Sequence, residues 1–465
     1  MASEPLHYFS LMDISAKVKS RELKPTTLTE AILKRIARHD GMLKSYTTLL
    51  ADRAMTKAKE AESELDRGFW RGPLHGVPIA VKDLCYTDYA PTAAGMFIHK
   101  DRVPPYTCTV VERLERAGGI ILGKLTMTEG AFATHHPNMP TPINPWNSEV
   151  WTGVSSSGSG SATAAGLCYG SLGSDTGGSI RFPSAACGLT GLKPTWGRVS
   201  RYGVCPLSES LDHIGPMART AADCAAILAA MAGADPRDPT ALLAPVLDYV
   251  ASLEGGLRGL RVGIDEAYAF NGLSEEVLKA LSAARDALVA LGARLVPIDF
   301  PSTSEAATAW GHLCLVETTI AHEATYPSRA AEYGPGLGGF LAGAGGVGAM
   351  DLGKAQIVRG KFLGQVGEAF QDIDVMLIPV IRTPSPTPAE WLEMLEGDIA
   401  QLLRYTAEFN LTGMPTITMN GGFDKRGAPI GFQLVGKHLS EDLLLRAGHA
   451  FQSITDWHTR HPPLD

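Results

Sequence analysis

The run GVSSSGSGSATAAGLCYGSLGSDTGGSIRFPSAACGLTG spans residues 153–191 and decides how the rest of the chain is interpreted. Glycine and serine supply 19 of its 39 residues, and its charged residues are Asp175 and Arg181. Such a run would ordinarily be a solvated linker. Here apolar residues interrupt it at spacings that suit a packed element: Ala164, Leu167, Tyr169, Leu172, Ile180, Phe182 and Leu189. Because small residues let a backbone approach its neighbours closely, the run predicts the packed centre of an enzyme.

The composition indicates a large buried core. Of the 465 residues, 45% are hydrophobic and 19% are charged, which is below the roughly 25% of an average globular protein. Such a chain is not disordered. We expect a single large α/β domain with a mixed central sheet and helices on both of its faces.

The charge pattern narrows the possible partners. The net charge is -8, and no run of lysine and arginine is longer than two residues, which argues against a nucleic acid or an anionic membrane as partner. The first residues lack the pattern of a signal peptide, and no stretch of 18 apolar residues occurs. We expect a cytoplasmic protein that acts on a small molecule as a monomer or homodimer.

Three regions follow one another along the chain. Residues 1–70 carry helical periodicity and predict a helical cover, whereas residues 71–220 contain short apolar runs such as VPIAV that are typical of buried strands. Residues 221–465 predict a second α/β part with pocket loops. In it LRGLRVGID, a helix at about 274–291 and ARLVPIDF together resemble a βαβ crossover, and further strands are expected at 375–379, 416–419 and 430–435. The glycine-rich segment 334–350 predicts a flexible loop or lid.

A site that cleaves amides needs a hydroxyl nucleophile, a base, and N–H donors where negative charge develops on the carbonyl oxygen. The sequence Thr176-Gly177-Gly178-Ser179 offers consecutive backbone N–H groups beside a serine hydroxyl, and glycines can adopt the turn that gathers them. Ser179 is therefore the candidate nucleophile.

The base must come from elsewhere, and four residues are candidates: His213, Lys193, Lys82 and Lys124. Lys82 ends the apolar run GVPIAVK, where burial would lower its pKa and make a neutral amine available. Lys124, at the end of IILGK, has almost the same context. These residues alone leave the choice between the two lysines open.

Several segments, taken in order, resemble the amidase signature family. They are GPLHGVPIAVKD at 72–83, NPWNSEVWTGVSSSGSGSATAAG at 144–166, GSDTGGSIRFPSAACGLTGLKPTWGRVS at 173–200, SLDHIGPMART at 210–220 and FNLTGMPTITMNGGFDKRGAPIGFQLVG at 409–436. The resemblance covers nearly the whole chain and implies the fold of that family.

The resemblance also implies a Ser-Ser-Lys triad. It assigns Lys82 as base, Ser155 as bridging serine after a cis peptide bond, and Ser179 as nucleophile, with the backbone of residues 176–179 as the oxyanion hole. Supporting roles fall to three further residues, with Ser156 orienting the loop and Asp175 and Arg181 fixing the turn. The chain departs from most relatives, which carry glycine in place of Val154 and Ser157.

The substrate is predicted from residues around the signature. The family segment equivalent to LTMTEGAF borders the site, so Met127 and Phe132 are pocket candidates. Residues 330–358 contain no arginine to hold a carboxylate, which favours a neutral amide, anilide or carbamate. The alternative is the glutamine-hydrolysing subunit of a tRNA-dependent amidotransferase, which has the same triad and works within a complex.

Other sequence motifs give weaker evidence of function. Asp175-Thr176-Gly177 matches the aspartic protease triplet, but the chain offers no second D-T-G or D-S-G. The G-x-G-x-x-G at 343–348 follows no clear strand. The seven cysteines contain no C-x-x-C pair, and the 13 histidines do not show the spacing of a zinc helix. We expect neither a metal nor a cofactor.

Overall fold

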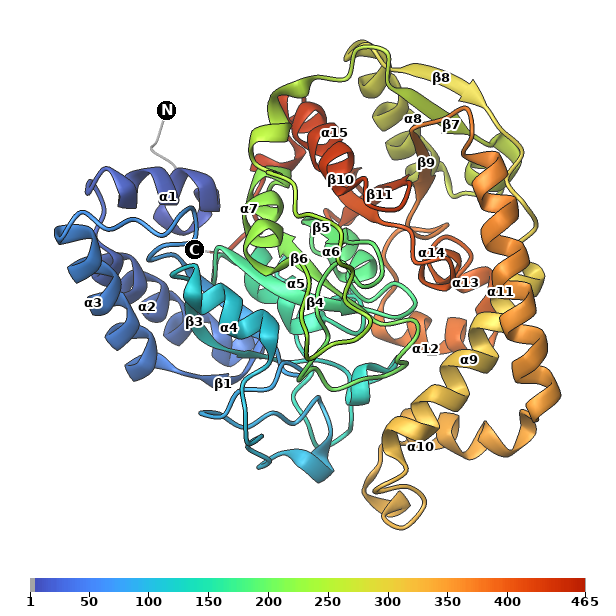
Figure 1. The fold of residues 1–465 in the computed structure, drawn as a ribbon, viewed down its shortest axis with the longest axis horizontal. Coiled ribbons are helices and arrows are strands. Elements are labelled where there is room, and N and C mark those ends of the chain that lie inside the picture. The colour runs from blue at the N-terminus through green and yellow to red at the C-terminus, as the bar shows by residue number, and fades with distance from the viewer. Residues whose placement is uncertain (1–4, 465) are drawn as a thin grey trace.

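The computed structural model describes residues 5–464 and places them around one mixed sheet (Figure 1). Over these residues the sheet has eleven strands in the order β1-β3-β2-β4-β6-β5-β10-β11-β9-β7-β8. The strands are β1 Tyr46–Leu49, β2 Pro78–Lys82, β3 Ile120–Leu125, β4 Gly170–Asp175, β5 Thr190–Lys193, β6 His213–Ala218, β7 Arg261–Ile264, β8 Arg294–Pro297, β9 Val375–Pro379, β10 Thr416–Phe423 and β11 Pro429–Gly436.

The sheet combines parallel pairs toward both of its ends with a run of antiparallel pairs at its centre. β2 runs parallel to both β3 and β4, and β7 runs parallel to both β8 and β9. The pairs β4–β6, β6–β5, β5–β10, β10–β11 and β11–β9 are antiparallel. The predicted βαβ unit is confirmed, because α8 (Glu275–Ala290) connects the parallel strands β7 and β8.

Helices cover both faces of the sheet. The other α-helices are α1 Leu11–Lys19, α2 Pro25–Leu43, α3 Ala51–Asp66, α4 Thr109–Arg116, α5 Ser157–Ala164, α6 Arg181–Ala186, α7 Ala221–Met231, α9 Ser304–His322, α10 Pro335–Ala342, α11 Ala349–Ala369, α12 Pro388–Glu396, α13 Ile399–Leu402, α14 Ala407–Leu411 and α15 Glu441–Ser453. On β11 the ring of Phe432 packs against Phe451 of α15, whereas Gly431 faces Ala185 of α6. Since neighbouring strand residues point to opposite faces, α15 and α6 lie on opposite sides. The predicted single α/β domain with a mixed sheet is confirmed.

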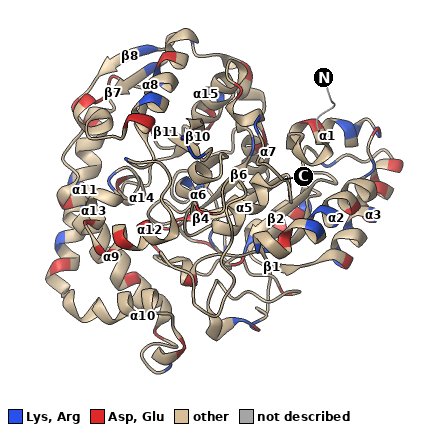
Figure 2. Cartoon of the chain, turned by 180° about the vertical axis from the view of Figure 1, so that it is seen from behind, with Lys and Arg blue, Asp and Glu red and all other residues tan. Residues whose placement is uncertain are grey.

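Charged residues of both signs lie along the outer helices (Figure 2). Figure 2 shows lysine, arginine, aspartate and glutamate interspersed over the periphery of the molecule, with no face given over to one sign. The helices α1 to α3 gather at one end of the molecule and α9 to α11 at the other (Figure 1). None of the helices within residues 5–464 combines the length and apolar character needed to cross a membrane.

Two sequence expectations differ from the structure. The segment 334–350 is not a loop: it forms α10, a 3-10 turn at Gly343–Gly346 and the start of α11. Leu337 and Leu341, one turn apart, are buried with Met96 and Tyr333, and this packing overrides the poor helix propensity of glycine. The N-terminal cover also contains a strand, β1, which pairs with β3.

The glycine-serine run is close-packed, as the sequence predicted. Helix α5 has the sequence SGSGSATA, and all of its residues are buried. A methyl group added to Gly158 would lie 2.5 Å from the carbonyl oxygen of Thr126 and 2.6 Å from that of Ser45. A side chain at this position would force the loop that carries the adjacent serines away from its neighbours.

Two glycine substitutions test this close packing. Gly158→Ala should lower the free energy of unfolding by about 1–3 kcal/mol because it overpacks a full core. Gly353→Ala, in helix α11, meets nothing within 4 Å and should raise it by about 0.5–1 kcal/mol through helix propensity. Urea unfolding of both variants measures the difference. Equal effects of the two substitutions would contradict the packing described for α5.

Candidate active site

Lys82 lies at the end of strand β2 and is completely buried. Its amine Nζ is 2.7 Å from the hydroxyl oxygen of Ser155 and 2.8 Å from those of Ser156 and Ser174. Burial lowers the pKa of Lys82 to about 7, because removal from water disfavours the charged ammonium form. Asp175 and Asp212 act in the opposite direction, but more weakly than burial. Near neutral pH a large fraction of this amine, which three hydroxyl groups surround, is therefore uncharged.

Lys124 has a different environment although its sequence context is similar. Its Nζ lies 3.3 Å from a carboxylate oxygen of Asp83 and donates a hydrogen bond to the hydroxyl of Thr92 at 2.6 Å. The structure thus separates two lysines that sequence reasoning left equivalent, and Lys82 is the one that contacts the serines.

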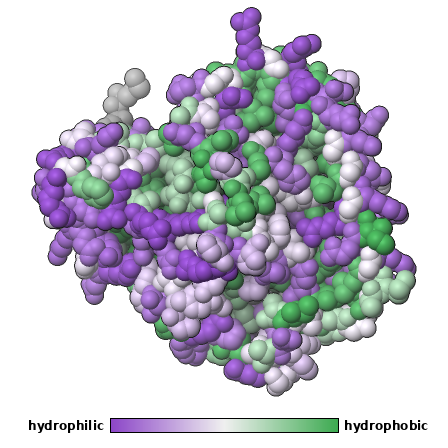
Figure 3. All heavy atoms as spheres, viewed as in Figure 1, coloured by the Kyte–Doolittle hydropathy of each residue, from purple (hydrophilic) through white to green (hydrophobic). Residues whose placement is uncertain are grey.

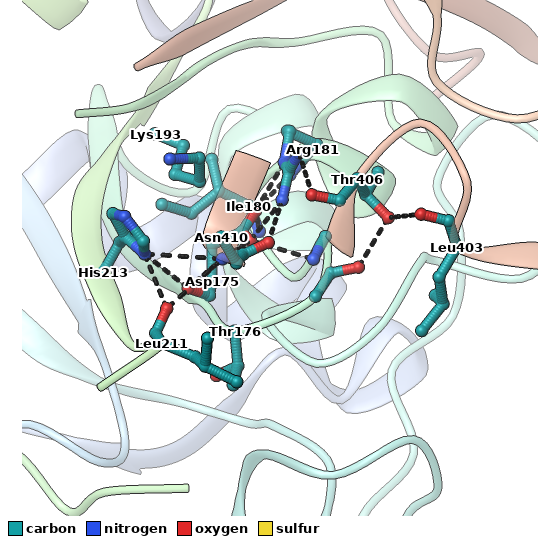
Figure 4. A network of polar contacts seen from close by, with 12 residues as sticks. Asp175, Thr176, Ile180, Arg181, Lys193, Leu211, His213, Leu403, Thr406 and Asn410 are labelled. Carbon is teal, nitrogen blue, oxygen red and sulfur yellow. Dashed lines mark hydrogen bonds and ion pairs between the residues drawn. The ribbon is translucent and has the colours of Figure 1, made fainter. Parts of the chain in front are cut away.

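The two remaining base candidates, Lys193 and His213, lie beside Asp175, as Figure 4 shows. Lys193 donates a hydrogen bond to the carbonyl oxygen of Met414 at 2.5 Å. His213 places Nδ1 2.7 Å from the carbonyl oxygen of Leu211, and burial lowers the pKa of its imidazole well below the ordinary value. Both are engaged by backbone groups.

The loop that carries Ser155 leads into helix α5, and its Ser155 hydroxyl contacts the Lys82 amine. The peptide bond between Val154 and Ser155 is cis. Ser156 is the residue before α5; its hydroxyl donates to the carbonyl oxygen of Ser174 at 3.3 Å and accepts from the Ser174 amide at 3.2 Å. Ser156 therefore fastens the loop to strand β4.

The turn that carries Ser179 is built around the carboxylate of Asp175. This carboxylate accepts hydrogen bonds from the amides of Gly178 and Ile180 at 2.8 and 3.0 Å, and from Arg181 at 2.7 and 3.0 Å. Asn410 of α14 donates to it at 2.9 Å, as Figure 4 shows. Burial alone would raise the pKa of Asp175, but the adjacent guanidinium holds it well below its usual range.

The backbone N–H groups of this turn are not equivalent. The sequence prediction included Gly178 in the oxyanion hole, and here it is wrong, because the Gly178 amide is committed to Asp175. The amides of Gly177 and Ser179 have no hydrogen-bond acceptor within residues 5–464. The hydroxyl of Ser179 is likewise free of protein partners in this described part of the chain. These groups can serve a bound molecule.

Ser179 opens into a cavity of about 780 Å³. Phe132 lines this cavity as predicted, and His135 lines it as well. The pocket prediction for Met127 is wrong, because that side chain is packed in the main hydrophobic core. The cavity is also lined by residues that the sequence analysis did not single out: Trp310, Cys314, Pro335, Phe340, Trp391, Leu392, Leu395, Ile399 and Leu403.

These additional wall residues come from α9, α10 and the α12–α13 region. The spacing of these apolar residues is typical of ordinary core packing. No local sequence pattern therefore distinguished them from core residues. In Figure 3 hydrophobic residues form one group at the lower right, over the region of α9 and α10, and further groups at the centre and top of this face. The cavity is thus an apolar chamber that places the signature residues on one wall and late helices on the other.

The sheet topology and the serine-lysine cluster define the class of amidase signature enzymes. The sequence profile of the family described as Amidase matches residues 27–445. The chain is 45% identical over 457 residues to the Mycobacterium tuberculosis protein named "Putative amidase AmiD", covering 98% of this chain and 96% of that one. It is 38% identical to one of the subunits of the Glutamyl-tRNA(Gln) amidotransferase of Methylococcus capsulatus, covering 98% and 99%.

A solved structure agrees with these relatives. The native peptide amidase from Stenotrophomonas maltophilia superposes with a TM-score of 0.83 at 29% identity, covering 99% of each chain. The chain therefore belongs to the amidase family. It is an amidohydrolase that acts on C–N amide bonds.

The buried ion pair in the Ser179 turn can be tested by its contribution to stability. Asp175→Asn should lower the free energy of unfolding at pH 7 by about 3–5 kcal/mol, because it leaves the Arg181 charge buried without its partner. A depressed carboxyl pKa stabilises the fold above the ordinary aspartate value of about 4, and this contribution is lost as the pH falls. Urea unfolding between pH 3 and 7 measures both effects.

The matched control is Glu332→Gln, which removes an exposed ion pair with Arg329 and should leave the unfolding midpoint unchanged. If Asp175→Asn were as stable as this control, the pair would not hold the turn.

Proposed function

We propose that the chain is a self-sufficient serine amidohydrolase that cleaves neutral, hydrophobic or aryl amides or carbamates. Ser179 is the nucleophile, Ser155 the bridging serine and Lys82 the base. The observation that carries the proposal is the buried Lys82 amine, which lies 2.7 Å from the Ser155 hydroxyl and has its pKa lowered to about 7, together with a cavity into which Ser179 opens.

The first half of the reaction forms an acyl-enzyme. Neutral Lys82 accepts the proton of the Ser155 hydroxyl, and Ser155 in turn accepts that of Ser179. The Ser179 oxygen attacks the carbonyl carbon, and the negative charge on the carbonyl oxygen is stabilised by the free amides of Gly177 and Ser179. When the C–N bond breaks, Ser155 gives its proton to the departing amine and regains one from Lys82.

The second half reverses these roles. A water molecule gives a proton to the same relay and attacks the ester carbonyl. The resulting acid leaves with the Ser179 oxygen reprotonated. For a carbamate the equivalent product decomposes to carbon dioxide and an alcohol or amine. No step requires a metal or an organic cofactor, and residues 5–464 contain no group of three or more His, Cys, Asp or Glu side chains suited to a metal ion.

The cavity lining supports a neutral substrate. No lysine or arginine of residues 5–464 lines it, and its acidic side chain is Glu396, which is exposed. Burial lowers the pKa of His135 to about 4, so this imidazole is neutral at physiological pH. A substrate carboxylate such as that of glutamine would find no cation, which argues against the alternative of an amidotransferase component. Accordingly, we propose action without a nucleic acid or membrane partner, as a cytoplasmic monomer or homodimer.

Amine release from a neutral anilide and a matched aryl carbamate tests this function. Ser179→Ala should abolish release, and Lys82→Ala should reduce kcat/KM by more than about 10³-fold, because members of a relay act as a unit. The control is Ser161→Ala, which removes a buried serine hydroxyl of α5 that donates to Ile143 and should retain activity. A folded Lys82→Ala variant with near-normal activity would contradict the assignment, as would a clear preference for glutamine over both neutral substrates.

The pH dependence gives a second test. The lysine must be neutral to accept a proton, and its pKa is lowered to about 7. The value of kcat/KM should therefore be low below pH 6, rise through pH 7 and level off above pH 8. Steady-state kinetics from pH 5 to 9.5 measure the profile. A rate that stays low up to pH 9.5 would mean that Lys82 keeps an ordinary ammonium pKa.

A further inference from the structure

Trp310 of helix α9 reaches the turn that carries Ser179. Its indole Nε1–H donates a hydrogen bond to the carbonyl oxygen of Thr176 at 2.8 Å. The ring also lies against Gly177, since a methyl group added there would be 2.6 Å from Cζ2 of Trp310. The same side chain lines the cavity. A residue 131 positions after Ser179 thus contacts the peptide next to one of its free amides.

That contact fixes the direction of the Gly177 amide. In a planar trans peptide the C=O and the following N–H point in opposite directions, and the Thr176–Gly177 bond is not among the cis bonds of the structure. Holding the Thr176 oxygen on one side therefore turns the Gly177 N–H to the other. This N–H has no acceptor within residues 5–464 and remains available to a substrate oxygen.

The neighbouring groups are held as well. The hydroxyl of Thr406 donates to the carbonyl oxygen of Gly177 at 2.7 Å, and the opposite end of that peptide, the Gly178 amide, donates to Asp175. The Thr176 side chain donates to the carboxylate of Asp212 at 2.5 Å. The Thr176–Gly177 and Gly177–Gly178 peptides are therefore both held by hydrogen bonds. Trp310 supplies the contact that orients the Thr176–Gly177 peptide.

Helix α9 is itself anchored beside this turn. Glu317, two turns after Trp310, accepts hydrogen bonds from the Ser208 hydroxyl at 2.6 Å and from the Ser210 amide at 2.8 Å. The segment 208–212 also contains Asp212, whose carboxylate accepts the hydrogen bond from the Thr176 hydroxyl. Arg359 of α11 donates to the Ser210 carbonyl oxygen at 3.0 Å. The indole is presented from a fixed helix rather than from a mobile loop.

We propose that Trp310 is a positioning residue that aims the Gly177 N–H at the oxygen on which negative charge develops. This inference rests on the proposed function of Ser179. Trp310 does not touch the reacting atoms. It acts through the Thr176–Gly177 peptide, so its effect belongs to the transition state rather than to substrate binding.

The test removes the indole donor. Trp310→Phe, and Trp310 replaced by 3-benzothienylalanine, which keeps the ring shape but lacks the N–H, should both lower kcat for the anilide by about 10- to 100-fold, less than or equal to the loss of a direct oxyanion donor. An aryl trifluoromethyl ketone, whose carbonyl carbon bonds to the Ser179 oxygen and whose carbonyl oxygen becomes the anion, should bind more weakly by the same factor.

The binding of the intact substrate should not be weakened in the same way. The Kd of the intact anilide, compared between Ser179→Ala and Ser179→Ala/Trp310→Phe, should agree within about threefold, since uniform binding does not contribute to kcat. The matched control is Trp146→Phe, which removes an indole donor to the carbonyl oxygen of Cys187 outside the cavity and should keep normal kcat and ketone affinity.

The outcomes separate the two proposals. Turnover that depends on Ser179 but is unchanged by the benzothienyl replacement would overturn the role of Trp310 alone. A loss of anilide affinity that accounts for the whole effect would also overturn it, because Trp310 would then be a binding residue. Turnover that survives Ser179→Ala would overturn the proposed function together with this inference.

Discussion

The burial of one lysine amine without a carboxylate partner is the constraint on which the rest of this site depends. Lys82 is removed from water by the serine loop and by strand β4, and its polar neighbours are the hydroxyls of Ser155, Ser156 and Ser174. Hydroxyls satisfy the amine without fixing its charge. A carboxylate in the same place would stabilise the ammonium form.

This burial explains why the signature region consists of small residues. Gly158 allows helix α5 to lie directly against the backbone at Ser45 and Thr126, which brings the preceding serines onto the lysine. The turn that carries Ser179 is held differently. The Asp175–Arg181 pair is buried and fully hydrogen-bonded, and the Asp175 carboxylate shapes the turn by accepting hydrogen bonds from its backbone amides. One charged network thus gives the turn its form, while an uncharged network beside it supplies the reactive groups.

Sequence patterns predicted what depends on local composition and order. The mixed α/β class, the βαβ unit around α8 and the strands near 375, 416 and 430 are confirmed. The choice between Lys82 and Lys124 depended on family resemblance, because their flanking residues are alike; the structure separates them through the contact of Lys124 with Asp83.

The features that were missed depend on long-range packing. The glycine-rich segment 334–350 becomes helical because Leu337 and Leu341 are buried against the nearby Tyr333 and against Met96, which is far away in sequence. The cavity wall formed by Trp310 and Trp391 has the same apolar periodicity as ordinary core. The engagement of the Gly178 amide could not be foreseen, since it is set by the three-dimensional path of the turn around Asp175.

The most direct test of the account is the ionisation of Lys82 itself. The protein can be labelled with ¹³C at the lysine ε-carbons, the Lys82 signal assigned by its loss in Lys82→Arg, and its chemical shift followed from pH 5 to 10. We predict a titration centred near pH 7, in line with the lowered pKa of this amine. A signal that remains that of an ammonium group up to pH 9 would contradict a neutral lysine base and, with it, the relay to Ser179.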